Sequence, residues 1–298
     1  MQISPELMLN FLISGVMIGT LYALMAMGIT FIYSIMKMIN WSMGEFYMIG
    51  SYAQWVLVSF LLGSQLWHIG VIGSAILLFL IGLVVQRILI RPMFTTSMER
   101  KDDYGTVVTI ALALFLRNLA TVLSGPNTRT PEVNLGRVVI GSLPISGNRF
   151  AAFIGGILVI ALFYVLLNYT WLGRAFRASS QNRVGVQTVG INILRIDQVA
   201  FALGVTLAGI AGALLAPVFN VFPENGAVTT MKGFEIIIIG GMGSLPGATL
   251  GGLLLGVVES LGSVLIDTSL RNVYGFALLI LILLIKPTGL LGERERLS

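Results

Sequence analysis

The sequence predicts an all-α protein, a polytopic bundle of membrane helices with discontinuous or re-entrant glycine-rich segments. Hydrophobic residues make up 56% of the 298 residues, and charged residues only 10%. Soluble domains carry about 25% charged residues, so this chain has too little charge to cover a water-facing surface. Its 35 glycines point the same way, because membrane helices use small residues where their backbones approach closely.

Eight apolar segments are candidates for membrane spans, because a helix needs about 20 apolar residues to cross the hydrocarbon core. Nothing outside them is long enough for a soluble domain, so residues 1–298 are expected to form a single transmembrane domain. Met1–Asn10 lacks the basic stretch of a cleaved signal peptide, which predicts that the first segment is retained. The segments are Met8–Met36, Glu45–Leu62, Trp67–Val85, Gly105–Ser124, Phe150–Leu167, Val199–Pro217, Phe234–Leu261 and Val273–Ile285.

The distribution of Lys and Arg predicts the orientation, because cytoplasmic loops are enriched in these residues. Basic residues follow the third, the fifth and the last segment, whereas the N-terminal tail has none. We therefore expect the N-terminus outside and the C-terminus in the cytoplasm. Eight single crossings would put both ends on the same side, so one segment must be broken or re-entrant, or one loop is wrongly assigned.

The seventh segment is the candidate for the break, because Gly240, Gly241, Gly243 and Gly247 interrupt it. Irregular backbone at membrane depth survives only where protein or a water-filled cavity covers it. These four glycines are therefore predicted to line a translocation pathway.

Ladders of small residues four positions apart predict close helix crossings. Such ladders either serve helix packing alone or also border a translocation pathway. The second alternative is possible because transporters place broken helices at their substrate sites. The ladders are Gly243, Gly247 and Gly251 with Gly252 and Gly256; Gly15, Gly19 and Ala23; and Gly204, Ala208 and Gly212.

A polar interruption at residues 40–45 lies between two apolar runs. It is either an ordinary cytoplasmic turn or a second broken region, in which case Asn40, Gly44 and Glu45 belong to the pathway. Ionisable residues within spans suggest a function by default. Arg117, near the middle of the fourth segment, could pair with a carboxylate, and Glu235 and Glu259 flank the glycine stretch.

The basic loop Gly173–Asp197 is too polar for a span, and its pattern predicts a short helix followed by a glycine stop. A partner subunit that drives conformational change could bind such an element. Arg177, Asn182 and Gly190 are the residues expected to contact that subunit. The alternative is a solvated basic loop.

Several kinds of chemistry are excluded by composition. The chain has no cysteine and one histidine, His68, which leaves no metal site or thiol nucleophile to expect. None of its four lysines is followed by Ser or Thr, so it has no phosphate-binding GxxxxGK[ST] loop. The formal charge of +5 is not concentrated in one segment, and no nucleic-acid partner is expected. We therefore expect neither a cofactor nor an enzymatic activity.

Five stretches in order resemble the branched-chain amino-acid ABC transporter permease family of the LivH type. The resemblance covers nearly the whole chain and extends distantly to ribose-type sugar permeases. The stretches are Leu21–Gly28; Ile39-Asn40 with Gly44-Glu45 and Met48–Gly50; Gly173–Ala175 through Gly190–Asn192; Gly240–Ser244 with Pro246–Ala248 and Gly251-Gly252; and Glu259-Ser260 with Lys286–Leu290.

The resemblance implies the permease subunit of an importer in a bacterial or archaeal plasma membrane. Its partners would be a second homologous permease, two ATP-binding subunits that hydrolyse ATP, and an external solute-binding protein. The loop at about residues 173–197 would be the coupling element, and alternating access would carry branched-chain or other neutral amino acids. Urea or short amides are compatible with the broader resemblance, and an ion-coupled secondary transporter is the main rival.

Overall fold

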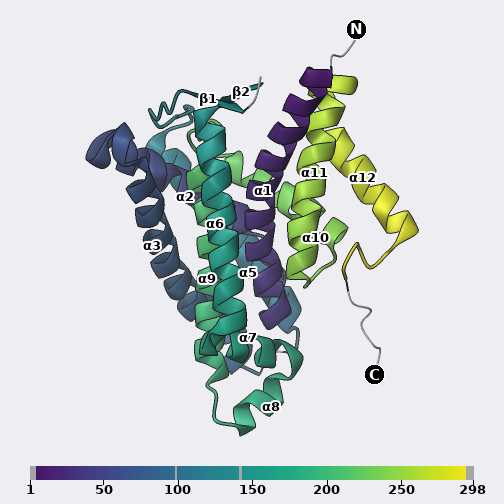
Figure 1. Cartoon of the computed structure of the whole chain (residues 1–298). Coiled ribbons are helices and arrows are strands. Elements are labelled where there is room, and N and C mark those ends of the chain that lie inside the picture. The colour runs from purple at the N-terminus through teal and green to yellow at the C-terminus, as the bar shows by residue number, and fades with distance from the viewer. Residues whose placement is uncertain (1–4, 98, 141–142, 293–298) are drawn as a thin grey trace.

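The computed structural model describes residues 5–97, 99–140 and 143–292, and their fold is almost entirely helical (Figure 1). Within these ranges seven helices are long and apolar enough to cross a membrane. They are α1 (Pro5–Met36), α3 (Trp67–Val85), α5 (Lys101–Ser124), α6 (Gly147–Tyr169), α9 (Ile193–Leu215), α11 (Leu245–Leu265) and α12 (Arg271–Ile285).

Shorter elements complete the bundle. Helices α7 and α8 lie at one end of it, and the antiparallel hairpin of β1 and β2 lies at the other, where α1 begins (Figure 1). The elements are α2 (Met43–Val56), the π-helices Leu57–Leu62 and Gln86–Ile90, the 3-10 turns Ser64–Leu66 and Thr268–Leu270, α4 (Pro92–Thr95), β1 (Arg137–Ile140), β2 (Leu143–Ser146), α7 (Trp171–Gln181), α8 (Arg183–Thr188) and α10 (Asn225–Gly240).

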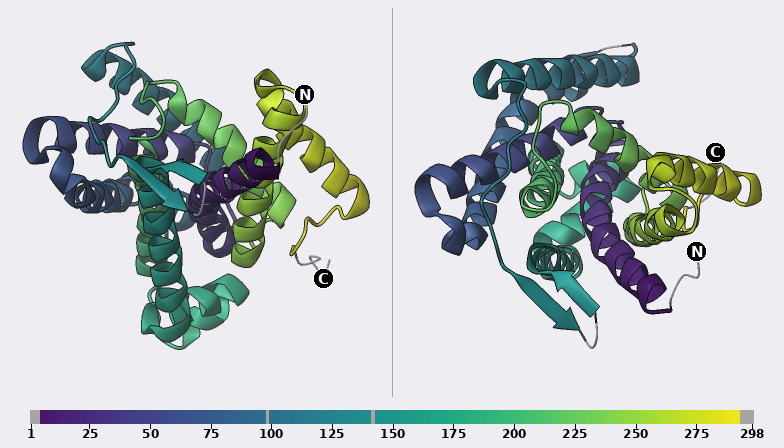
Figure 2. Two further views of the ribbon diagram at one scale, coloured as in Figure 1. Left: turned by 45° about the horizontal axis from the view of Figure 1, so that its top comes forward. Right: turned by 90° about the horizontal axis from the view of Figure 1, so that it is seen from above.

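Helices α1 and α9 form the centre of the bundle. The apolar windows of both are 72% buried, whereas that of α12 is only 11% buried. Viewed from above, α3, α5, α6 and α12 surround them (Figure 2). The outer helices expose large apolar side chains such as Ile76, Phe115 and Leu158, as expected for surfaces that contact lipid.

Two of the three predicted ladders meet in the contact between α1 and α11, through Gly252 and Gly256 of the second helix. A Cβ atom added at Gly15 would lie 2.8 Å from the carbonyl oxygen of Gly256, and one at Gly19 would lie 2.8 Å from that of Gly252. The two helices run antiparallel, since Gly252 also faces Ala23. Their backbones can come this close only because side chains are absent on both sides.

We expect Gly256→Ala to destabilise this contact. The added Cβ would overlap the Cα of Gly19 and the carbonyl oxygen of Gly15, which are backbone atoms that cannot rotate away. Overpacking costs about 1–3 kcal/mol, so the purified variant should aggregate at a lower temperature in detergent. Gly105→Ala is the matched control, because its Cβ would meet the flexible end of Met93, 3.1 Å away at sulfur. Equal melting of the two variants would contradict the prediction.

The seventh predicted segment is broken, as its glycines indicated. Helix α10 ends at Gly240 and α11 begins at Leu245. The turn lies beside the last turn of α1, with a Cβ at Gly243 placed 3.8 Å from the Tyr33 ring. From there α11 returns along α1 in the opposite direction. Two helical segments fall short of the length and hydropathy of these seven long helices. One is α2 with its π-helical extension, where the sequence predicted the second span, and the other is α10.

Candidate translocation and coupling sites

The polar interruption at residues 40–45 is a break buried inside the protein. Lys37, with a left-handed φ of 53°, follows the end of α1. The Asn40 side chain is 1% exposed, and its Oδ1 accepts hydrogen bonds from the backbone N–H of Ser42 at 3.0 Å and from its hydroxyl at 2.7 Å. Helix α2 therefore begins within the bundle.

Gly44 and Glu45 bring the start of α2 against the start of α10. The Gly44 N–H donates to the Thr230 hydroxyl at 3.1 Å, and a Cβ at Gly44 would overlap the carbonyl oxygen of Gly226. The Glu45 carboxylate is 1% exposed and accepts from Arg117 at 2.7 Å. Arg117 thus pairs with Glu45, a partner that the sequence left open.

The four glycines of the second break allow close backbone contacts. Gly241 and Gly243 have φ values of 102° and 85°, which disfavour any other residue. A Cβ at Gly240 or at Gly247 would overlap the carbonyl oxygen of the other. The segment after α12 closes the turn, since the N–H of Leu291 donates to the Gly240 carbonyl at 2.8 Å.

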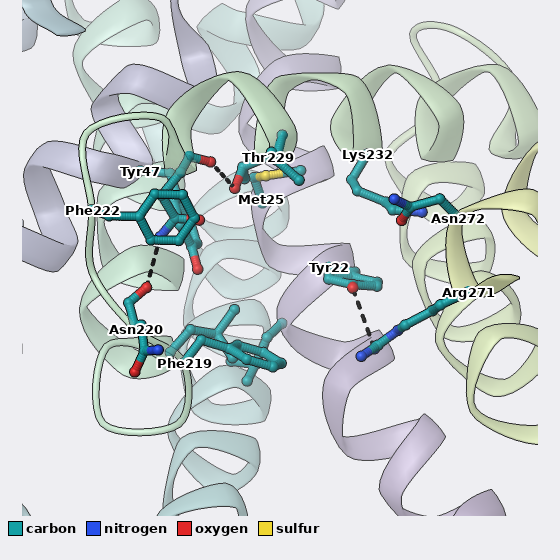
Figure 3. A pocket seen from close by; sticks show the side chains of 14 residues that line it. Tyr22, Met25, Tyr47, Phe219, Asn220, Phe222, Thr229, Lys232, Arg271 and Asn272 are labelled. Carbon is teal, nitrogen blue, oxygen red and sulfur yellow. Dashed lines mark hydrogen bonds between the residues drawn. The ribbon is translucent and has the colours of Figure 1, made fainter. Parts of the chain in front are cut away.

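A cavity of about 350 Å³ lies between α1, α9, α10 and the start of α12 (Figure 3). Its described lining does not include the seven residues that the sequence assigned to a pathway, and their transport role stays a prediction. The two breaks are connected to the cavity through α10, which contributes to the cavity wall and also contacts both breaks. The lining residues include Tyr22, Met25, Tyr47, Phe219, Asn220, Phe222, Asn225, Lys232, Arg271 and Asn272.

A buried charge cluster supports one side of this cavity. Glu259 is fully buried, and its carboxylate accepts hydrogen bonds from Lys232, from Arg271 Nε at 2.9 Å and from the Tyr22 hydroxyl at 3.3 Å. Lys232 also lies 3.1 Å from a carboxylate oxygen of Glu235. The sequence singled out both glutamates but not Lys232 or Arg271, because each cation lies close to a segment end, where it is expected to reach water.

The predicted coupling loop folds into α7 and α8. Arg177 donates to the carbonyl of Leu167 and so fixes α7 to the end of α6. Asn182 joins the two short helices and caps α8 by accepting from the Gly185 N–H at 2.8 Å. Gly190 follows α8 with a φ of 82°. The structure thus contains two short helices where the sequence predicted one before its glycine stop.

Arg183, which sequence reasoning missed, ties α8 to the rest of the bundle. Its guanidinium makes a bidentate pair with the fully buried Asp197 of α9, at 2.6 and 3.1 Å. It also donates to the carbonyl of Ile35 in α1 at 2.8 Å and lies 4.8 Å from the centre of the Phe94 ring. One side chain therefore connects the loop with α1, α4 and α9.

We expect Gly190→Val to disturb the loop more than Gly190→Asn. A Cβ at Gly190 has open space around it, so any effect comes from the left-handed backbone, which Asn tolerates and β-branched residues do not. Uptake by cells that carry each variant should fall with Val and stay close to normal with Asn. An equal loss with both would show that the backbone conformation is not what matters.

In the part of the chain that the structure describes, a bundle of seven long apolar helices, with a polar break, a glycine-rich break and two short helices at one end, defines a multi-pass membrane protein. Residues 11–285 match the family described as the permease component of the branched-chain amino acid transport system, and the chain belongs to this family. It is therefore a transporter permease.

Curated relatives extend over nearly the full chain. The high-affinity branched-chain amino acid transport system permease protein LivH of Escherichia coli K12 is 34% identical over 95% of this chain and 94% of its own length. BraD, the corresponding Pseudomonas aeruginosa PAO1 permease, is 32% identical over 95% of each chain. The E. coli permease LivM is 24% identical over 91% of this chain and 68% of its own. No solved structure matches the chain.

Proposed function

We propose that this chain is a permease subunit of an ATP-driven importer for branched-chain or other neutral amino acids. The observation that carries the proposal is the 34% identity to a branched-chain amino acid permease over 95% of the chain. Residues 1–298 would form a single transmembrane permease domain, with a coupling loop at about residues 173–197. Asn40, Gly44, Glu45 and the glycines of the second break would lie at joints that rearrange during alternating access.

The proposed complex contains a second homologous permease, two ATP-binding subunits and an external solute-binding protein. The match to both LivH and LivM supports a pair of related permeases. Arg177, Asn182 and Gly190 hold or terminate α7 and α8, which would contact an ATP-binding subunit. The Arg183 contacts would carry a movement of α8 directly to α1 and α9.

The proposed orientation in the plasma membrane puts the N-terminus outside and the C-terminus in the cytoplasm. It is supported by the positions of the elements, because α1 begins at the end of the bundle opposite α7 and α8 (Figure 1). The segment that follows α12 returns to the break near Tyr33, which is on the side of α7 and α8.

Uptake by the complete complex in vesicles tests this function. Radiolabelled leucine should accumulate only when ATP is present inside, and unlabelled leucine, isoleucine and valine should compete. Accumulation driven by an ion gradient without ATP would indicate a secondary transporter instead. Uptake of urea or short amides in place of amino acids would overturn the substrate assignment.

A further inference from the structure

The cavity between α1, α9, α10 and α12 has two chemically different sides. Lys232, Arg271 and Asn272 lie on one side, with Tyr22 beside Arg271 (Figure 3). Across from them lie Phe219 and Phe222, which come from the loop between α9 and α10, together with Asn220 and Tyr47. Small-molecule sites typically combine apolar walls with a few polar groups in about 300–1,000 Å³, and this cavity lies within that range.

The two cations are held in place but retain donors for a ligand. The hydrogen bonds of Arg271 to the described residues use Nε for Glu259 and Nη2 for Tyr22, out of the five N–H groups of a guanidinium. Its side chain is 32% exposed. Because Glu259 and Tyr22 hold the guanidinium through these two groups, its remaining N–H groups are available to an anion such as a carboxylate.

The apolar side suits an aliphatic group. Besides the two phenylalanines, the lining includes the apolar side chains of Leu21, Met25 and Val228. A methionine side chain adapts to ligands of differing shape, as a site for several aliphatic side chains requires. A strongly hydrated solute without an apolar part would gain nothing from this wall.

The cavity also lies in the half of the bundle that would receive solute from outside. Helix α9 begins next to α8, and its other end, at Leu215, borders the cavity. The cavity is therefore separated from the coupling loop by most of the length of α9.

We propose that this cavity is a transit subsite for a free aliphatic α-amino acid. The carboxylate lies at Arg271 and Lys232, and the side chain packs against Met25, Phe219 and Phe222. This assignment rests on the proposed function and adds to it a place in the permease where the solute itself binds.

Photolabelling of the complete complex tests the subsite. The probe is photo-leucine, the diazirine analogue of leucine, and labelled peptides are mapped by mass spectrometry. We expect label on residues 21–25 or 219–228. Leucine should compete for it, whereas isopentylamine, which has the same side chain without the carboxylate, should not.

Val228→Trp fills the cavity and should reduce this label at least about tenfold, since a blocked site loses its ligand. The matched control is Val165→Trp on α6, because the two valines are 52% and 51% exposed and Val165 does not line the cavity. This control should label as the native complex does. Both valines expose enough of their side chains for the larger residue to fit without unfolding the bundle.

Three outcomes would overturn the subsite. Label elsewhere in the chain, or equal competition by isopentylamine, would show that the cavity does not recognise the carboxylate. Competition by phosphatidylglycerol but not by leucine would assign the cavity to an anionic lipid. ATP-driven leucine uptake that persists under either result would leave the proposed function standing, whereas a native complex that takes up no amino acid would refute the function itself.

Discussion

Glu259→Ala should give the largest loss of folded protein among single substitutions in the bundle. Glu259 is fully buried and pairs with both Lys232 and Arg271. Its removal leaves Lys232 in the interior and Arg271 at the cavity wall with less compensation, and breaking a buried pair from one side costs about 3–5 kcal/mol. The yield of the protein that remains monodisperse in mild detergent, and its thermal stability, should both fall sharply.

Two further variants separate charge from shape. Glu259→Gln keeps the volume and an accepting oxygen but removes the charge, so its loss should be intermediate. Asp103→Asn removes a pair with Arg100 in which the side chains are 82% and 58% exposed, and such surface pairs contribute about 0–1 kcal/mol. If Glu259→Ala were as stable as Asp103→Asn, the cluster would not stabilise the bundle.

The sequence predicted the positions of the helices better than it predicted the contacts between them. The length and hydropathy of each long apolar run are local properties, and they gave the class of fold. The ladder at Gly15, Gly19 and Ala23 also indicated close packing. Its partner at Gly252 and Gly256 lies more than 200 residues away, and spacing within one ladder does not say which other ladder it meets.

The same reasoning explains what was missed at the sites. Arg117 was a candidate for pairing, but Glu45 is 72 residues distant, and only the position of α2 beside α5 brings them together. In the sequence, nothing distinguishes Arg183 from the other basic residues of the predicted cytoplasmic loop. Its pairing with Asp197 depends on the turn that Asn182 and Gly190 impose on α8, which brings its first residue back to the start of α9.

Arg183→Lys should abolish most uptake while the complex still assembles. Lysine keeps the positive charge near Asp197, so the buried carboxylate is not left alone. It cannot reproduce the bidentate pair, the bond to the Ile35 carbonyl and the contact with the Phe94 ring together, because these need the planar guanidinium. The link from α8 to α1 and α9 would therefore loosen at both ends.

The expected size of the effect follows from the states that a transporter must exchange. A change of about 1.4 kcal/mol in the energy of one state shifts the populations about tenfold, so losing one or two hydrogen bonds suffices to lower uptake by that factor. ATP hydrolysis by the copurified complex should persist and no longer be matched by solute accumulation. Arg195→Lys is the matched control, since this exposed side chain lies on the same helix as Asp197 and should tolerate the change. Normal uptake in Arg183→Lys, or an equal loss in Arg195→Lys, would show that coupling does not pass through the Arg183 contacts.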